Sequence, residues 1–129
     1  MALAASIISS AAEPALPATH TNGVVAYVMG GIGEDEAKAI GQAAKYYPLE
    51  CEFVRKAAPR DQYLAGVRIW IRDANQKVVL DLTSNGPFLL ARLPDGPYTV
   101  SAQHGAHVER RHVNVAGSER RRLVFEWRE

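Results

Sequence analysis

Apolar and polar positions alternate along most of the chain beyond residue 48. A period of two residues is typical of β-strands that bury one face. The expected strands cover residues 49–55, 64–72, 78–83, 88–93, 98–103, 108–115 and 122–127. Turn-forming pairs such as Asn85-Gly86 and Asp95-Gly96 separate them. Short strands at this spacing predict a mainly β fold, an antiparallel β-sandwich of about seven strands.

Two elements with other patterns precede these strands. Residues 24–29 are apolar at both odd and even positions, which predicts a strand covered on both faces. Residues 34–46 have apolar positions at helical spacing and are followed by Pro48, so we expect one N-terminal α-helix there. The small residues Ala37, Gly41 and Ala44 share one side of this helix. We expect that side to pack closely on a sheet.

The segment 88–100, FLLARLPDGPYTV, predicts a β-hairpin corner. Asp95-Gly96 supplies a tight turn, and Pro97 begins the returning strand where no amide donor is needed. This segment resembles the corner of carboxypeptidase regulatory-like domains, and the resemblance covers roughly residues 64–127. It implies a transthyretin-like β-sandwich, which in that family is usually a non-catalytic module of exported proteins.

The length of 129 residues predicts a single domain, which we place at residues 24–129 with the strand and helix as its N-terminal βα unit. Residues 1–12 are small and apolar and end in Ser10-Ala11-Ala12, the pattern of a signal peptidase site. Residues 13–23 have linker composition. We therefore interpret residues 1–23 as a signal remnant and linker, which predicts a periplasmic or secreted protein. The alternative is a disordered tail on a cytoplasmic protein.

Composition excludes some partners. The net charge is +1, so nucleic acid is not an expected partner. A membrane span is not expected either, because the apolar stretches fall short of about 20 residues. The glycine-rich run 30–33 precedes Glu34, Asp35 and Glu36, whose charges would repel a phosphate, so we expect a structural turn and no cofactor. Cys51 alternates with apolar neighbours, which predicts a buried, inert thiol.

Three histidines, His104, His107 and His112, lie close together on either side of an expected turn. Neutral imidazoles on facing strands can bind Cu or Zn, so these residues are a candidate metal site. Exposed turn histidines without a metal are the alternative.

Trp70 lies between Arg68 and Arg72 on the parity opposite the apolar positions of its strand, so it should point out of the sandwich. An exposed aromatic ring between two guanidinium groups suits a carbohydrate, a peptide or a partner protein. The alternative is structural: the helix covers Trp70, and Glu50 and Glu52 oppose the two arginines.

A second candidate binding surface is the first strand, which we expect at a sheet margin. It carries Val24, Ala26 and Val28 and has no charge or proline to prevent pairing with another chain. We expect partner binding or self-association there. The sequence contains no G-x-S-x-G nucleophile motif, and we do not expect an enzyme. The predicted function is a non-catalytic interaction or structural module that contacts another protein or a cell-envelope component. The alternative is a small-ligand or metal-binding protein that uses the histidine hairpin.

Overall fold

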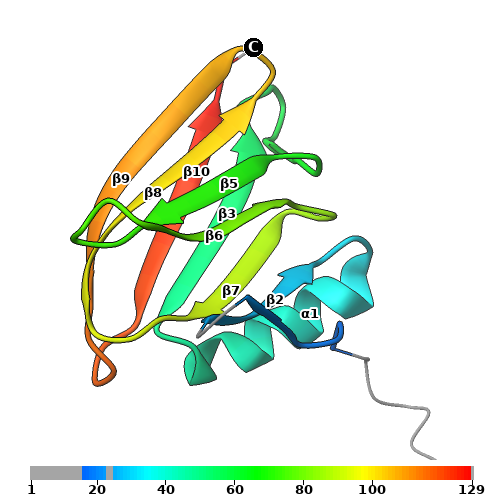
Figure 1. The fold of residues 1–129 in the computed structure, drawn as a ribbon. Helices are drawn as coiled ribbons and strands as arrows, with labels where there is room; N and C mark the ends of the chain where they lie inside the picture. Colours follow the sequence, from blue (N-terminus) through cyan, green and yellow to red (C-terminus); the bar gives the residue numbers. More distant parts are fainter. Residues whose placement is uncertain (1–15, 23–24, 129) are drawn as a thin grey trace, which may run out of the picture.

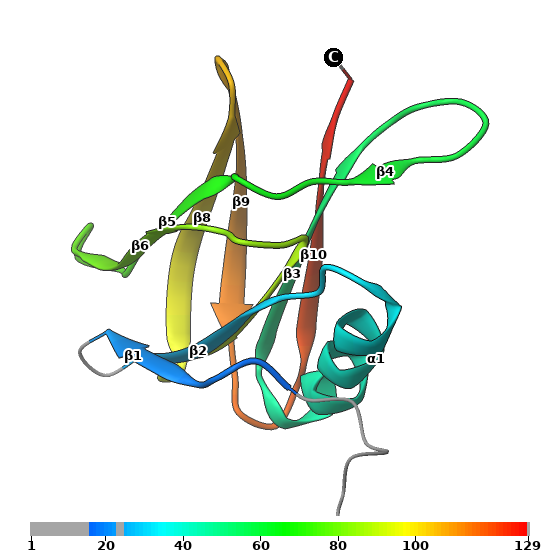
Figure 2. The same ribbon diagram turned by 90° about the vertical axis from the view of Figure 1, so that its right-hand side faces the viewer.

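The computed structural model describes residues 16–22 and 25–128, which form two β-sheets and one α-helix. The first sheet has the order β1 (His20–Asn22), β2 (Val25–Gly30), β7 (Phe88–Arg92), β3 (Leu49–Arg55) and β10 (Arg121–Trp127), with β4 (Gln62–Tyr63) also paired to β3. The second sheet has the order β6 (Val78–Thr83), β5 (Arg68–Arg72), β8 (Gly96–His104) and β9 (His107–Val115). The helix α1 (Glu34–Ala43) continues into a 3-10 turn, η1 (Ala44–Tyr46). Figures 1 and 2 show α1 on the outside of the first sheet, away from the second.

The main core lies between the two sheets, because alternate side chains of each strand point inward. The second sheet contributes residues that include Ile69, Ile71 and Val100, each 0% exposed. The first sheet contributes an aromatic group in which the ring centroids of Phe53 and Phe125 are 5.9 Å apart. The mainly β fold with one helix is therefore confirmed, as is the predicted burial of Cys51.

A smaller core joins α1 to the outer side of the first sheet. Ile40 of α1 is fully buried against Val28 of β2 and Leu90 of β7. The prediction that Gly41 belongs to the packed side is wrong. Gly41 is exposed, and a Cβ atom at this position would meet no atom within 4 Å. Ala44 is buried as expected, but Ile40 forms the centre of the contact.

The expected hairpin corner at residues 88–100 is instead a crossover between the sheets. Strands β7 and β8 belong to different sheets and do not pair. The Tyr98 hydroxyl donates a hydrogen bond of 2.6 Å to the carbonyl of Pro94, and the carboxylate of Asp95 accepts one of 2.8 Å from the amide of Gly117. Burial, followed by the nearby Asp73 and Asp95 charges, raises the pKa of Tyr98. The turn chemistry was thus predicted correctly, but the pairing was not.

Three further expectations need correction. The strand pairing is not wholly antiparallel as expected, because β10 runs parallel to β3. Residues 20–22, expected in a linker, form β1. The strand expected at 64–72 begins only at Arg68. The proposed signal segment 1–12 lies outside the described residues, and none of the described helices is long and apolar enough to cross a membrane.

The first expected strand is not a sheet margin. Strand β2 lies between β7 and β1, and β1 pairs with Val25, Ala26 and Tyr27. Val28 is fully buried beneath α1, and Val24 lies outside the described residues. The structure therefore removes the accessible strand edge on which binding through Ala26 and Val28 depended. Among the described residues, the strands of the first sheet with a single pairing partner are β1, β10 and the short β4.

Candidate binding face of the second sheet

The outward side chains of the second sheet form a polar surface that we call the Trp70 face. Cross-strand pairing brings its members together. Trp70 pairs with Asp81 of β6 and Ser101 of β8, and Ser101 pairs with Arg110 of β9. In the next outward row, Arg72 pairs with Thr99, which pairs with His112. The members are Arg68, Trp70, Arg72, Asp81, Thr99, Ser101, Arg110 and His112.

The helix does not cover this surface, contrary to the structural alternative for Trp70. The contacts of α1 are with β2 and β7 of the first sheet. Glu50 and Glu52 also lie on the first sheet, where both form ion pairs with Arg122 of β10 and none with Arg68 or Arg72. Trp70 is consequently half-buried by neighbouring side chains alone.

Arg68 is the most constrained cation of the Trp70 face. Its Nη2 atom lies 3.0 Å from Asp81 Oδ2, and its Nε donates to Asp81 Oδ1 at 3.3 Å. The carboxylate raises the pKa of this guanidinium through hydrogen bonding and its charge. The same guanidinium lies 5.1 Å from the centroid of the Trp70 ring, in cation–π geometry. Arg68 therefore covers part of Trp70 and holds it in place.

The other two arginines have no carboxylate partner among the described residues. Arg72 Nη1 donates a 2.9 Å hydrogen bond to the carbonyl of Gln76, a residue that adopts a left-handed φ of 65° in the β5–β6 turn. Arg110 is exposed and has no side-chain hydrogen bond or ion pair within the part of the chain that is described. Most of their guanidinium donors are free to bind an anion.

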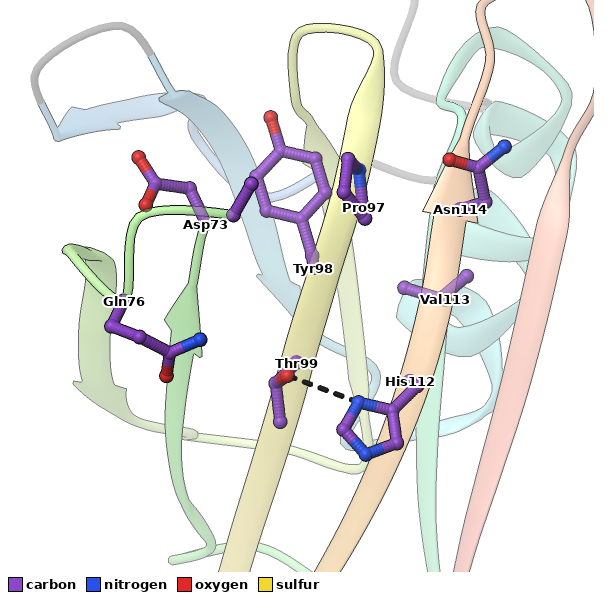
Figure 3. Close-up of a pocket in the computed structure, with 9 residues that line it drawn as sticks. Asp73, Gln76, Pro97, Tyr98, Thr99, His112, Val113 and Asn114 are labelled. Atoms are coloured by element: carbon purple, nitrogen blue, oxygen red, sulfur yellow. Dashed lines mark hydrogen bonds between the residues drawn. The ribbon is translucent and has the colours of Figure 1, made fainter.

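A groove of about 610 Å³ lies over the Trp70 face. A second depression of about 570 Å³ adjoins it where β8 begins and β9 ends. Gln76, Thr99 and His112 line both. Figure 3 shows Thr99 and His112 side by side on β8 and β9, where Thr99 Oγ1 and His112 Nδ1 share a hydrogen bond of 3.1 Å. The two hollows therefore adjoin at these three residues.

The three histidines do not come together. His104 and His107 face each other at the end of the β8–β9 hairpin, and the His104 ring lies 6.0 Å from that of Trp127. On β9, His112 points to the opposite side of the sheet from His107 and lies beside Thr99 on the Trp70 face. No group of three or more His, Cys, Asp or Glu side chains suited to a metal occurs in residues 16–22 and 25–128. Their spacing in the sequence did not reveal that they occupy two faces.

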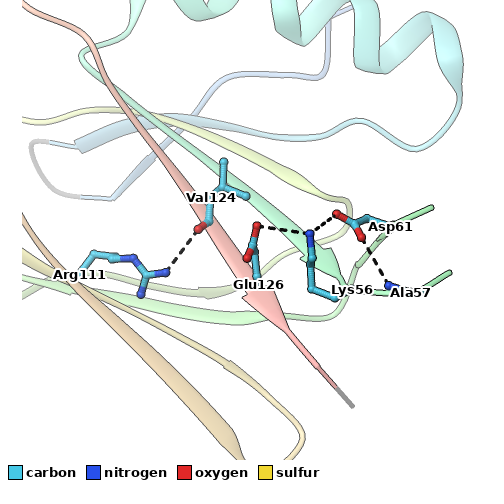
Figure 4. Close-up of polar contacts among 6 residues, drawn as sticks. All are labelled: Lys56, Ala57, Asp61, Arg111, Val124 and Glu126. Atoms are coloured by element: carbon cyan, nitrogen blue, oxygen red, sulfur yellow. Dashed lines mark hydrogen bonds and ion pairs between the residues drawn. The ribbon is translucent and has the colours of Figure 1, made fainter. Parts of the chain in front are cut away.

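Other polar groups are accounted for by structural contacts. Lys56 Nζ lies 2.9 Å from Asp61 Oδ2 and 4.0 Å from Glu126 Oε2, as Figure 4 shows. Their hydrogen bond raises the pKa of Lys56 and lowers that of Asp61. Nearby, Arg111 Nη2 donates to the Val124 carbonyl at 3.5 Å. Burial, with the Glu50 charge, raises the pKa of Cys51 to about 12, so its thiol stays protonated.

Sequence reasoning identified Arg68, Trp70 and Arg72 but missed Asp81, Thr99, Ser101 and Arg110 as members of the same surface. Each alternates with inward residues of its own strand, as Thr99 and Ser101 do on either side of Val100. Parity could therefore have marked them as outward. It could not show that β5 pairs with β8 or that β8 pairs with β9.

Comparison of the chain with protein-family models, curated proteins and solved structures finds no match. The functional argument consequently depends on the geometry of the chain itself.

Proposed function

We propose that this protein is a non-catalytic, exported module that binds a cell-envelope component or another protein through the Trp70 face. The observation that carries the proposal is the open groove of about 610 Å³ in which a half-buried tryptophan lies between guanidinium groups. Aromatic and arginine side chains are the residue types that contribute most often to binding energy at interfaces. The opposite sheet carries α1, so the Trp70 face is the broad sheet surface left open to a ligand.

The proposed fold is a transthyretin-like sandwich of the carboxypeptidase regulatory-like kind. Its support is the pattern of two packed, mostly antiparallel sheets and the corner that Tyr98 closes onto Pro94. The proposed export rests on the small apolar composition of residues 1–12.

The absence of catalysis is part of the proposal and has chemical support. Cys51 is fully buried and its raised pKa keeps it in the thiol form, which is a poor nucleophile. Ser84 is buried, and its hydroxyl accepts a hydrogen bond of 3.1 Å from the amide of Val67. Both groups therefore serve the fold.

Co-sedimentation with the insoluble cell-envelope fraction of the source organism tests the binding role. We expect the wild-type protein to sediment with that fraction and Trp70→Ala to remain in the supernatant. Tyr46→Ala is the matched control, because Tyr46 is an aromatic residue with 64% exposure on η1, remote from the Trp70 face. The proposal fails if the wild type does not sediment, or if Trp70→Ala sediments equally well.

A further inference from the structure

The Trp70 face carries more positive than negative side chains, which favours negatively charged ligands. Its cations are Arg68, Arg72 and Arg110, and its only carboxylate within the described residues is Asp81. Asp81 is already bonded to Arg68. A guanidinium binds a carboxylate through two parallel hydrogen bonds, and Arg72 and Arg110 retain donors for such contacts. The ligand that complements this surface carries repeated negative charges.

The remaining members of the groove suit hydroxyl groups. Thr99 offers a hydroxyl that donates and accepts, and the exposed His112 and Gln76 add a ring nitrogen and an amide, whereas Ser101 is only 2% exposed and forms part of the floor. Trp70 is partly covered by Arg68, and the exposed part of its ring provides an apolar surface of the kind against which the C–H side of a sugar ring packs. Val78 is the only aliphatic side chain in the lining of this groove. The groove therefore matches a ligand that is rich in hydroxyls and poor in aliphatic side chains.

Backbone geometry disfavours an extended peptide on the same surface. Strand β5 is paired on both sides, by β6 and β8, and β8 is paired on both sides, by β5 and β9. Their amides and carbonyls are thus used within the sheet and are not available for strand addition. Recognition here depends on side chains. The described residues that line the second hollow, beyond Thr99 and His112, include the Asp73 carboxylate and no arginine or lysine, so the acidic ligand is assigned to the Trp70 face alone.

We propose that the ligand of the Trp70 face is an acidic polysaccharide, a chain of sugar rings that carry carboxylates, as in polyuronic acids. The carboxylates pair with Arg72 and Arg110, the hydroxyls bond to Thr99 and His112, and one sugar ring packs on Trp70. This inference rests on the binding role proposed above and names the chemical class of its ligand.

Isothermal titration calorimetry of the full chain with three polymers tests the assignment. Sodium polygalacturonate is the acidic sugar chain, dextran the neutral sugar chain and poly-L-glutamate the acidic peptide. We expect saturable binding of polygalacturonate that weakens as NaCl is raised, because salt screens exposed charges. Dextran and poly-L-glutamate should each bind at least tenfold more weakly.

Two variants and one control locate the binding. Trp70→Ala and Arg110→Ala should each weaken polygalacturonate binding at least tenfold. Arg120→Ala is the matched control, since Arg120 is an exposed arginine between β9 and β10 and outside the groove, so that the same change in net charge should leave the affinity unchanged. Far-UV circular dichroism checks that all three variants are folded.

Each other outcome overturns the inference. Equal binding of dextran would show that charge is not recognised, and stronger binding of poly-L-glutamate would assign the face to an acidic protein. If Arg110→Ala and Arg120→Ala lose affinity for polygalacturonate equally, the binding depends on net charge and not on the Trp70 face. If no polymer binds while envelope sedimentation still depends on Trp70, the polysaccharide is wrong and the binding role stands. If sedimentation is also independent of Trp70, both proposals fail.

Discussion

Gly41 and Gly31 differ in what surrounds them, although both lie in the N-terminal βα unit. Gly41 lies within α1, is exposed and has open space where a Cβ would lie. Gly31 has a left-handed φ of 102°, and a Cβ there would overlap the Phe88 ring. A glycine is needed at Gly31, whereas at Gly41 it only adds conformational freedom to the unfolded chain.

Gly41→Ala should therefore stabilise the protein by about 0.5–1 kcal/mol, the usual difference between glycine and alanine within a helix. Gly31→Ala should destabilise it by about 1–3 kcal/mol through overpacking and backbone strain. Urea denaturation of the two variants measures both effects. A loss of stability in Gly41→Ala would place that side of α1 against the sheet, as the sequence pattern had suggested.

Cys51 predicts a specific pH dependence of stability. Its pKa is raised from 9.0 to about 12 in the folded protein, first by burial and then by Glu50. The unfolded thiol ionises near its ordinary pKa while the folded thiol cannot, so the free energy of unfolding falls as pH rises from about 9 toward 12. Below about pH 9 the thiol contributes no such change.

Cys51→Ala lacks this contribution. Its stability should consequently decline less steeply than that of the wild type between pH 8 and 10.5, as measured by urea denaturation at each pH. Other groups that titrate in this range are common to both proteins and cancel in the comparison. Parallel pH profiles would show that the thiol ionises without unfolding and that Cys51 is accessible.

At the scale of the elements, β10 is joined to β3 by a charged contact as well as by the parallel ladder. Arg122 of β10 forms ion pairs with Glu50, at 3.7 Å, and with Glu52 of β3. Glu52 has only 9% of its surface exposed, so its carboxylate depends on this guanidinium for its charge partner. A nearly buried charge that loses its partner is costly.

Arg122→Met should destabilise the protein by about 1–3 kcal/mol because it leaves Glu52 without that partner. The double variant Arg122→Met, Glu52→Gln should recover part of the loss, since no buried charge is then left unpaired. A double-mutant cycle by thermal or urea denaturation measures the coupling. If the two substitutions are additive, β10 is held by the ladder and the apolar core alone.

The helix shows how an element can be located correctly while one residue of its packed side is misplaced: Ala37 and Ala44 face the sheet as predicted, and Gly41 does not. The position of the helix followed from apolar spacing and from Pro48, and both agree with α1 and η1. Its packed side was assigned to small residues, yet Ile40 is the residue that fills the space between Val28 and Leu90. Burial of a large apolar side chain gains more free energy than close approach through glycine, which explains why Ile40 and not Gly41 is at the centre of the contact.

For the whole molecule, three layers decide where binding can occur. The second sheet, the first sheet and α1 follow one another across the structure, as Figure 2 shows. The helix occupies part of the outer side of the first sheet and the inner sides form the core, so the outer side of the second sheet is left as a broad polar surface. The pairing of β1 with β2 and the position of α1 together leave the Trp70 face, and not β2, as the candidate site.

The strands and their inward residues were predictable because the two-residue period is a local property of the extended backbone. Val67, Ile69 and Ile71 point inward as the alternation indicated, and Arg68, Trp70 and Arg72 point outward. The turn at Asp95-Gly96 was predictable for the same reason, since glycine tolerates the φ of 148° found there.

Tertiary structure alone decided which strands pair, which face α1 covers and which outward residues meet. The corner at Pro94 looked like a hairpin because the same turn chemistry serves a crossover between sheets. The β5–β8–β9 strand order places His112 and His104 on different sides of the sheet and brings Trp70 and Arg110 onto the same side. Such pairing joins residues far apart in the chain, and its free energy comes from burying whole faces together, so no local pattern specifies it.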